Sequence, residues 1–167
     1  MRDGHFEIVP LGKQDRSEFS CGSDALDRYF KTQVTQDIRR RVSACYISLE
    51  TASDKIAGYY TLSAADISVS DLPGEMVRRL PRYPSVPAAR IGRLAVDRRY
   101  QGRRLGGALL LNAAMRAVRS EVAVFALVVD AKDEKASAFY RRHEFTAFGS
   151  SPLQLIAPLD TFRKFLS

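Results

Sequence analysis

The stretch RIGRLAVDRRYQGRRLGG, residues 90–107, is the part of the sequence that decides the fold. It begins with an apolar run at 91–96, turns at a charged corner at 97–99, and enters a glycine-containing turn before a helix that starts near residue 104. The order strand, turn, helix leaves backbone N–H groups free at the start of the helix, where the helix dipole favours anions. The turn is therefore a candidate pyrophosphate site, and the strand before it can offer its backbone to the rest of an extended ligand.

Outward from this stretch, hydrophobic periodicity predicts alternating strands and helices. Before it we expect a strand at 6–11, a helix from Ser23 or Asp24 to about Gln36, a hairpin of strands at 43–49 and 56–63, a short helix starting at Asp71 or Pro73, and a proline-rich surface loop at 78–87. Around and after it we expect a strand at 88–96, a helix at 105–119, a strand buried on both faces at 122–129, a helix at 131–142 capped by Asp133, and short strands at 144–148 and 153–156. This order predicts an α/β fold with a mixed sheet and one parallel crossover.

Length and composition indicate one globular domain, residues 1–167. Hydrophobic residues make up 46% of the chain and charged residues 27%, which are ordinary globular proportions. The net charge of +7 favours an anionic partner such as nucleic acid, a phosphorylated cofactor or an acidic protein. The excess is mostly arginine, which suits phosphate binding but can also reflect genome base composition, so charge alone leaves both interpretations open.

Other features of the sequence argue against several classes of protein. Cys21 and Cys45 have no metal-ligand spacing, and His5 and His143 are the only histidines, so we expect neither a metal site nor a structural disulfide. The N-terminus has no apolar signal segment and no stretch is long enough to cross a bilayer. We therefore expect a cytoplasmic protein.

The glycine spacing separates three kinds of phosphate loop. The ATP-binding loop requires Lys and Ser or Thr after its last glycine, and the dinucleotide loop requires GxGxxG; neither fits Gly102, Gly106 and Gly107. The segment YQGRRLGG instead resembles the [QR]-x-x-G-x-[GA] acyl-CoA loop of the GNAT superfamily of N-acetyltransferases. Arg104 stands where that motif usually has an inner glycine, so its backbone must either adopt the strained conformation or lie differently against the phosphate.

The resemblance extends over most of the chain. The segment ASAFYRRHEF, residues 136–145, is similar to the A-x-x-F-Y-x-x-x-G-F signature, which implies that Tyr140 protonates the departing CoA thiolate. The alternative for Tyr140 is a core aromatic whose hydroxyl is satisfied locally. Glu144 replaces the usual glycine before Phe145. The resemblance implies the GNAT acyltransferase fold, a central mixed and mostly antiparallel sheet flanked by helices.

Three further segments resemble the GNAT toxins of bacterial type II toxin–antitoxin modules: FSCGSDALDRYF at 19–30, IAGYYTLS at 56–63, and PAARIGRLAVD at 87–97. That resemblance implies acetylation of the α-amino group of aminoacyl-tRNA, inhibition of translation, and a ribbon-helix-helix-type antitoxin as protein partner. Two alternatives stay open, a GNAT enzyme acting on a small amine or a protein N-terminus, and a CoA-binding module without catalysis. The sequence also leaves open whether the chain forms a homodimer.

The resemblance assigns roles to particular residues. The backbone N–H of Leu94 would polarise the acetyl carbonyl of acetyl-CoA, with Tyr140 as general acid. The residues expected to bind acetyl-CoA are Leu94, Ala95, Val96, Arg98, Arg99, Gln101, Gly102, Arg103, Arg104, Leu105, Gly106 and Gly107. The residues expected to bind tRNA are Arg39, Arg40, Arg41, Arg78, Arg79, Arg82, Arg90 and Arg93, with Tyr83 as a stacking partner, although each arginine taken alone also fits a solvated surface.

Overall fold

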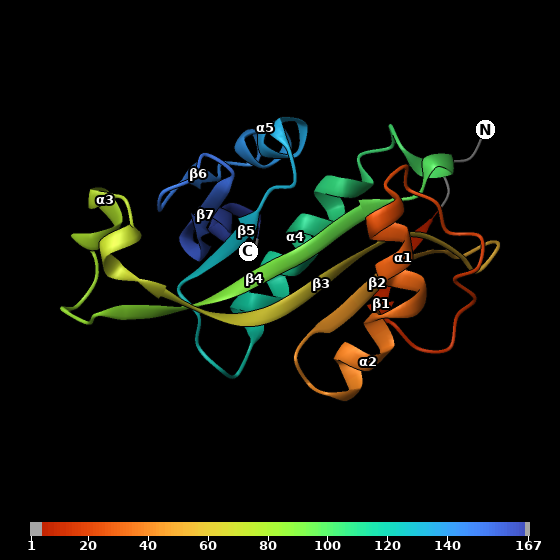
Figure 1. Ribbon diagram of the computed structural model, residues 1–167, viewed down its shortest axis with the longest axis horizontal. Helices are drawn as coiled ribbons and strands as arrows, with labels where there is room; N and C mark the ends of the chain where they lie inside the picture. The colour runs from red at the N-terminus through yellow and green to blue at the C-terminus, as the bar shows by residue number, and fades with distance from the viewer. Residues whose placement is uncertain (1–4, 166–167) are drawn as a thin grey trace. The chain divides into compact units, whose positions relative to one another are not determined.

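The computed structural model describes residues 5–165 of the chain. The strands are β1 (Phe6–Pro10), β2 (Ala44–Glu50), β3 (Lys55–Ser68), β4 (Ser85–Val96), β5 (Ala126–Asp130), β6 (Thr146–Ala147) and β7 (Gln154–Pro158). The α-helices are α1 (Asp24–Thr32), α2 (Val34–Arg39), α3 (Gly74–Val77), α4 (Leu105–Arg119) and α5 (Glu134–Arg142) (Figure 1). Short 3₁₀ helices lie at Val69–Asp71, Arg98–Tyr100 and Leu159–Phe165.

The strands form a mixed sheet in the order β1-β2-β3-β4-β5-β7-β6. The pairs β1/β2, β2/β3, β5/β7 and β6/β7 are antiparallel. The pair β4/β5 is parallel, with Ala88 opposite Ala126 and Ile91 opposite Val129, and α4 forms the crossover between the two strands. These pairings confirm the predicted α/β class and the mostly antiparallel sheet flanked by helices.

The chain divides into two compact units. Unit 1 consists of Met1–Ser63 and Gly92–Ala113, and unit 2 consists of Ala64–Ile91 and Ala114–Ser167. The boundaries between the units fall inside β3, β4 and α4, so each of these elements contributes residues to both units. The expectation of a single domain stays a prediction.

In unit 1, α1 and α2 cover strands β2 and β3 (Figure 1). Phe30 and Val34 on the helices pack with Phe19, Ile47 and Tyr59 in one apolar cluster, and the rings of Phe30 and Tyr59 stack at 4.2 Å. Burial of large aromatic rings contributes much of the stability of a small unit of this kind. The helix pair is therefore held rigidly on its strands.

In unit 2, strand β5 is buried on both faces, as its continuous apolar sequence predicts. Its residues pack in a cluster that contains Ile67, Met76, Val86, Phe148 and Ile156. The strand itself begins at Ala126, four residues later than predicted, and Val122 is 74% exposed. Apolar composition alone therefore overestimated the length of this strand.

Several boundaries differ from the predicted ones. The helix predicted to run to about Gln36 is two helices that meet at Gln33, whose φ of −117° is far from that of a regular helix although its ψ of −34° is helical; Val34, the first residue of the second helix, is fully buried. Strand β3 continues to Ser68, and β4 already begins at Ser85 within the segment predicted as a loop. No helix within residues 5–165 has the length and hydrophobicity needed to cross a membrane.

Candidate active site

The loop after β4 has the backbone of an anion site. Gly102 and Arg104 both lie in the left-handed region, at φ 84° and 63°, and α4 begins at the next residue, Leu105. The N–H of Ala108 donates to the carbonyl of Arg104 at 3.2 Å, so the N–H groups of residues 104–107 precede the first i to i−4 bond of the helix. A pyrophosphate fits this arrangement, since N–H groups and the positive end of a helix dipole point to the same place.

Arg104 therefore adopts the conformation that the glycine of the motif would adopt. A left-handed conformation costs a residue with a Cβ about 1–2 kcal/mol. Glu144, the second position that departs from the motif, is left-handed as well, at φ 72°. Of the two possibilities left open for Arg104, the structure shows the strained backbone rather than a displaced loop. Neither substitution prevents the backbone from forming its turn.

Asp97 holds this loop from within unit 1, a role that the sequence did not reveal. Its carboxylate is 1% exposed and accepts hydrogen bonds from the backbone N–H of Ser20 at 3.1 Å and of Arg99 at 2.9 Å. The guanidinium of Arg99 also donates to both carboxylate oxygens, at 2.9 and 3.1 Å. Burial opposes ionisation of Asp97, but the hydrogen bonds from Arg99 and Ser20 outweigh it and hold its pKa below the ordinary value.

Gln101 fastens the same loop to the segment before α1. Its side-chain amide donates to the backbone carbonyls of Val96 at 2.9 Å and Cys21 at 3.1 Å. The N–H of Arg98 donates to the carbonyl of Ser20 at 2.8 Å. The FSCG segment at 19–22 is therefore a structural partner of the candidate acyl-CoA loop.

The arginines of the loop are not equivalent. Arg99 is committed to Asp97 and lies 3.5 Å from the carboxylate of Glu18, and Arg103 lies 5.6 Å from the ring of Tyr100. Arg104 forms no hydrogen bond or ion pair with another residue in 5–165 through its side chain. The side chains of Arg98 and Arg103 likewise form no hydrogen bond or ion pair with a residue in 5–165, so all three charges are available for a phosphate, and the backbone N–H groups would supply the remaining contacts.

A cavity of about 640 Å³ also opens in unit 1. It is lined by Lys13, Gln14, Asp15, Glu18, Phe19, Ser53, Asp54, Lys55, Ile56 and Arg99. Of the residues predicted to bind acetyl-CoA, the cavity includes Arg99 alone, and Glu18 pairs there with Lys55 at 3.9 Å. The cavity and the phosphate loop are therefore different features of the unit.

Strand β4 carries Leu94, Ala95 and Val96 towards the loop, and β3 approaches it closely. The hydroxyl of Thr61 accepts a hydrogen bond from the N–H of Arg93 at 3.0 Å. A Cβ placed on Gly58 would lie 2.9 Å from the carbonyl oxygen of Ala95, closer than real Cβ contacts. The backbone of β4 at these residues is therefore positioned by two residues of the IAGYYTLS segment.

Tyr140 lies in unit 2, on α5, whose N-cap is Asp133 as predicted. The residue is 5% exposed, and its ring contacts those of Phe139 and Phe145 at 5.1 and 5.4 Å. Its hydroxyl forms no hydrogen bond with another residue in 5–165, so no local partner satisfies it there. Burial raises the pKa of the hydroxyl above its ordinary value, which keeps the proton in place at neutral pH.

The turn after α5 follows directly from Tyr140. The N–H of Phe145 donates to the carbonyl of Tyr140 at 3.2 Å, across the left-handed Glu144. The carboxylate of Glu144 accepts a hydrogen bond from Lys164 at 3.2 Å. The backbone at Tyr140 is thus held by the turn that follows it.

The predicted tRNA-binding arginines are shared between the units. Unit 1 contains Arg39, Arg40, Arg41 and Arg93, and unit 2 contains Arg78, Arg79, Arg82 and Arg90. In unit 2, Arg90 forms an ion pair with Asp130 at 2.8 Å, and Arg79 lies 3.9 Å from Asp160. Tyr83, the predicted stacking residue, is 63% exposed.

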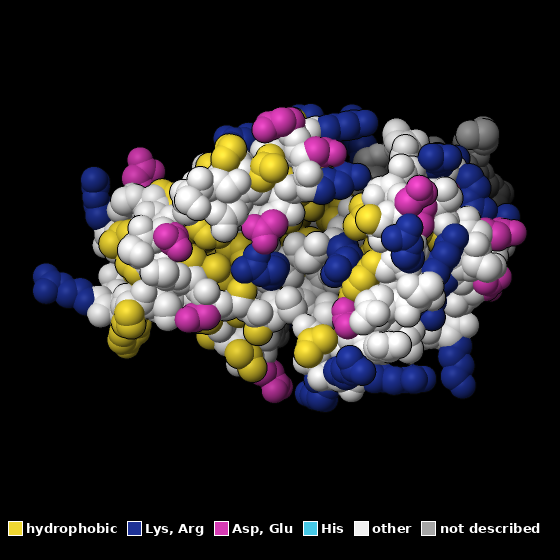
Figure 2. Space-filling model, viewed as in Figure 1, with side chains coloured by type: hydrophobic (Ala, Val, Ile, Leu, Met, Phe, Trp, Pro, Cys, Tyr) yellow, Lys and Arg dark blue, Asp and Glu magenta, His cyan; other side chains and the backbone are white. Residues whose placement is uncertain are grey.

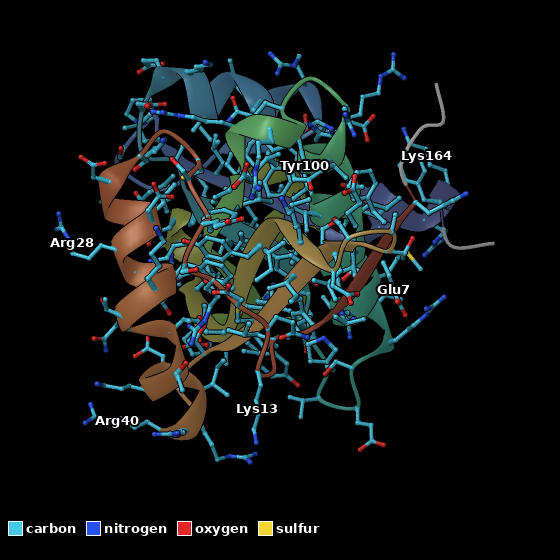
Figure 3. The ribbon with its side chains drawn as sticks, turned by 90° about the vertical axis from the view of Figure 1, so that its right-hand side faces the viewer. Glu7, Lys13, Arg28, Arg40, Tyr100 and Lys164 are labelled. Atoms are coloured by element: carbon cyan, nitrogen blue, oxygen red, sulfur yellow. The ribbon has the colours of Figure 1, made fainter. Side chains whose placement is uncertain are left out.

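In unit 1, basic side chains lie on the outer side of the helix pair, but Arg93 does not. Figure 2 shows Lys and Arg side chains exposed over the region of α1 and α2. In the turned view of Figure 3, Arg28 and Arg40 project outward from these helices, whereas Tyr100 lies inside the unit. Arg93 is partly buried and covers the ring of Tyr29, with its guanidinium carbon 3.4 Å from the ring centre.

The mixed sheet, the crossover helix with its left-handed loop and the buried tyrosine define an acyl-CoA-dependent acyltransferase fold. Residues 14–145 match the acetyltransferase (GNAT) family, and the chain belongs to that family. It is 32% identical over 144 residues to a tRNA-acetylating toxin of Mycobacterium tuberculosis, covering 85% of this chain and 84% of the relative. It is 29% identical over 170 residues to a probable toxin TacT of Sinorhizobium fredii, covering 95% and 94%.

Solved structures agree with this assignment. AtaT complexed with acetyl-methionyl-tRNAfMet has a TM-score of 0.88 and 26% identity, covering 98% of this chain and 100% of that one. AtaTR bound with acetyl-CoA has a TM-score of 0.82 and 27% identity, covering 97% and 98%. A mutant AtaT toxin bound to the C-terminus of the antitoxin AtaR has a TM-score of 0.80 and 25% identity, covering 97% and 98%. The GNAT fold expected from the sequence is confirmed.

Proposed function

We propose that this protein is the toxin of a type II toxin–antitoxin module, which transfers the acetyl group of acetyl-CoA to the α-amino group of aminoacyl-tRNA. The observation that carries the proposal is its 32% identity, over 85% of its length, to a tRNA-acetylating toxin. An acetylated amino group cannot attack the growing peptide, so the reaction stops translation. Charged tRNA is a cytoplasmic substrate, and we place the protein in that compartment.

Acetyl-CoA supplies the acetyl group as a thioester, with CoA thiolate as the leaving group. The N–H groups of residues 103–107 would hold its pyrophosphate, together with the side chain of Arg104. Asp97 and Gln101 keep that loop in shape through their hydrogen bonds within unit 1. The N–H of Leu94 would polarise the acetyl carbonyl, as an oxyanion donor does in other acyl transfers.

Tyr140 would act as the general acid. The amine nitrogen forms a bond to the acetyl carbon, the carbon–sulfur bond breaks, and the Tyr140 hydroxyl gives its proton to sulfur. The proton that the attacking nitrogen loses then restores the Tyr140 hydroxyl, so the products are the amide and free CoA thiol. A buried hydroxyl with a raised pKa is protonated at neutral pH and therefore available as a donor. The α-amino group of an aminoacyl ester is partly neutral near pH 7, so the chain needs no strong base of its own.

The arginines of both units would bind the tRNA backbone, chiefly through phosphate contacts. Arg78, Arg79 and Arg82 in unit 2 and Arg39–Arg41 in unit 1 are the residues that we assign to this surface. Reversing Arg78 and Arg79 to Glu is expected to weaken acetylation of tRNA while acetyl-CoA binding is kept. An equal loss of both would contradict the assignment.

The protein partner would be an antitoxin of the ribbon-helix-helix type. The solved complex of a mutant AtaT toxin with the C-terminus of the antitoxin AtaR supports an antitoxin as the protein partner. An antitoxin that covers the arginines would prevent tRNA from reaching the acetyl group. A homodimer is compatible with this proposal, and the oligomeric state can be measured by light scattering on the purified protein.

The deciding experiment is transfer of labelled acetyl from acetyl-CoA to a mixture of charged and uncharged tRNA, followed by identification of the modified amino acid. We expect label on the amino acid of charged tRNA and none on uncharged tRNA. Tyr140→Phe is expected to bind acetyl-CoA and lose transfer, and its expression is expected to leave growth unaffected where the wild type stops it. Label confined to small amines or protein N-termini, or none at all, would contradict the proposal.

A further inference from the structure

Arg93 differs from the other arginines of unit 1 in how it is held. The central carbon of its guanidinium lies over the Tyr29 ring, 3.4 Å from the ring centre, which is the distance of a stacked contact. Arg16 also lies near an aromatic ring, Phe30, but at 5.7 Å, and its nitrogens are used by the Phe30 carbonyl and the Thr35 hydroxyl. The Arg93 guanidinium forms no hydrogen bond or ion pair with any residue in 5–165. The Tyr29 ring therefore holds one face of the Arg93 guanidinium, and the guanidinium N–H groups are available to bind a ligand.

Tyr29 is itself held in place by a second contact. The ring is 7% exposed, and its hydroxyl donates to the carboxylate of Asp37 at 2.7 Å. Asp37 also accepts a hydrogen bond from the side chain of Gln33 at 3.2 Å, one helical turn earlier. Burial, followed by the hydrogen bond to Asp37, raises the pKa of Tyr29 to about 12. These contacts fix the orientation of the Tyr29 ring, and the ring in turn fixes the orientation of the Arg93 guanidinium plane.

The position of Arg93 on β4 limits what it can contact. The next residue is Leu94, and successive residues of a strand are about 3.3 Å apart. The N–H of Arg93 is already used by Thr61, so its side chain is the part available to a ligand. If Leu94 receives the acetyl carbonyl, as the proposed function requires, then Arg93 lies beside the end of the acceptor that carries the amino group. On charged tRNA that end is the unpaired 3′-terminal nucleotide.

We propose that Tyr29 and Asp37 are positioning residues, which hold the Arg93 guanidinium to receive the 3′-terminal nucleotide of charged tRNA. This inference rests on the proposed function. A guanidinium covered by an aromatic ring on one face can stack on a base with the other, and its edge can donate to phosphate or ribose oxygens. A lysine cannot reproduce this contact, because an ammonium has no plane to stack.

The test is a double-mutant cycle on Tyr29→Leu and Arg93→Lys, measuring kcat and the KM values for charged tRNA and acetyl-CoA. We expect each single change to raise the KM for tRNA about fivefold, the effect of a cation–π contact of about 1 kcal/mol. The double variant is expected to be no worse than the poorer single one, because the two residues act as a unit. Arg28→Lys, an exposed arginine on α1, is the matched control and is expected to change neither KM.

A charge-matched pair at Asp37 separates positioning from simple electrostatics. Asp37→Asn and Asp37→Ala remove the same charge, but Asn keeps an acceptor for the Tyr29 hydroxyl. We expect the KM for tRNA to stay near that of the wild type with Asn and to rise about threefold with Ala, the effect of one lost hydrogen bond. Tyr29→Phe keeps the ring but loses the hydroxyl, so it is expected to match Asp37→Ala; if Tyr29→Leu does not fold, these variants of Tyr29 and Asp37 carry the test.

The outcomes distinguish this inference from the proposed function. A wild type that acetylates charged tRNA, together with additive effects in the cycle or equal effects of Asn and Ala at Asp37, would overturn the inference alone. A wild type that does not acetylate charged tRNA would overturn the proposed function and this inference with it.

Discussion

The buried carboxylate of Asp97 accepts a hydrogen bond at 3.1 Å from the backbone N–H of Ser20, a residue 77 positions earlier in the chain. The carbonyl of Ser20 in turn accepts one from the N–H of Arg98 at 2.8 Å. These two bonds join the segment before α1 to the loop after β4 at adjacent residues. The shape of the candidate acyl-CoA loop therefore depends on a distant part of the sequence.

Asp97→Asn is expected to lower the free energy of unfolding by about 2 kcal/mol at neutral pH, because the neutral amide loses the charge-assisted hydrogen bonds that the buried carboxylate accepts from Arg99 and Ser20. The pKa of Asp97 is depressed in the folded protein. Its contribution is therefore fully present above the unfolded pKa of about 3.9 and is lost as the pH falls through the lower folded value. Urea denaturation of the wild type and of Asp97→Asn, at pH 7 and at successive pH values below 4, measures the difference in their free energies of unfolding. A difference between the two proteins that does not shrink in acid would contradict it.

Arg104→Gly and Arg104→Ala are expected to weaken acetyl-CoA binding equally, because both remove the same charge. They are expected to differ in stability. Glycine relieves the left-handed strain whereas alanine keeps it, so we expect Gly to be the more stable variant by about 1 kcal/mol. Chemical denaturation gives the stabilities, and calorimetric titration gives the acetyl-CoA affinities. Equal stabilities would mean that the backbone of residue 104 is not strained.

Gly58→Ala is expected to destabilise the protein by about 2 kcal/mol and to raise the KM for acetyl-CoA. The added Cβ would lie 2.9 Å from both the Ala95 carbonyl oxygen and a methyl group of Leu109, and the Ala95 backbone cannot move without shifting β4. Gly74→Ala is the control, because a Cβ there meets no atom within 4 Å. A Gly58→Ala protein with unchanged stability would show that β3 and β4 are farther apart than described.

The pH dependence of the reaction is expected to show no loss from Tyr140 near pH 10. Because burial raises the pKa of this hydroxyl above the ordinary value of about 10, it still holds its proton where an exposed tyrosine would begin to lose it. The rate is expected to rise as the acceptor amine loses its proton and then to stay level to at least pH 10. Initial rates on charged tRNA measure this. A fall centred below pH 10 would contradict a buried general acid.

Local sequence patterns predicted most of the fold. The helix at 105–119 and the hairpin of β2 and β3 follow from periodicity and turn residues, which depend on neighbours in the chain. The patterns failed where a boundary depends on packing. The helix break falls at Gln33, next to the fully buried Val34, and the late start of β5 leaves Val122 in solvent. Neither packing event has a signature within a few residues.

The residues of the candidate site also fall into two groups, those that the sequence revealed and those that only the structure revealed. Gly102, Gly106 and Tyr140 were recognisable because their spacing in the chain is that of a known motif. The residues that hold the site in place, Asp97 and Tyr29, could not be recognised from the sequence. Asp97 looked like part of a charged corner, Tyr29 lies within a predicted helix without a motif to mark it, and the partners Ser20 and Arg93 are distant in the sequence.

The sequence by itself determined the class of fold and the candidates for the phosphate loop and the general acid, because each depends on residues close together in the chain. Only the tertiary structure decided which arginines are available. It pairs Arg99 with Asp97 and Arg90 with Asp130, and it leaves Arg93 held by its face on Tyr29 with its N–H groups unused by the described residues. The physical reason is that the charge an arginine offers to a ligand depends on the carboxylates and rings that folding brings next to it.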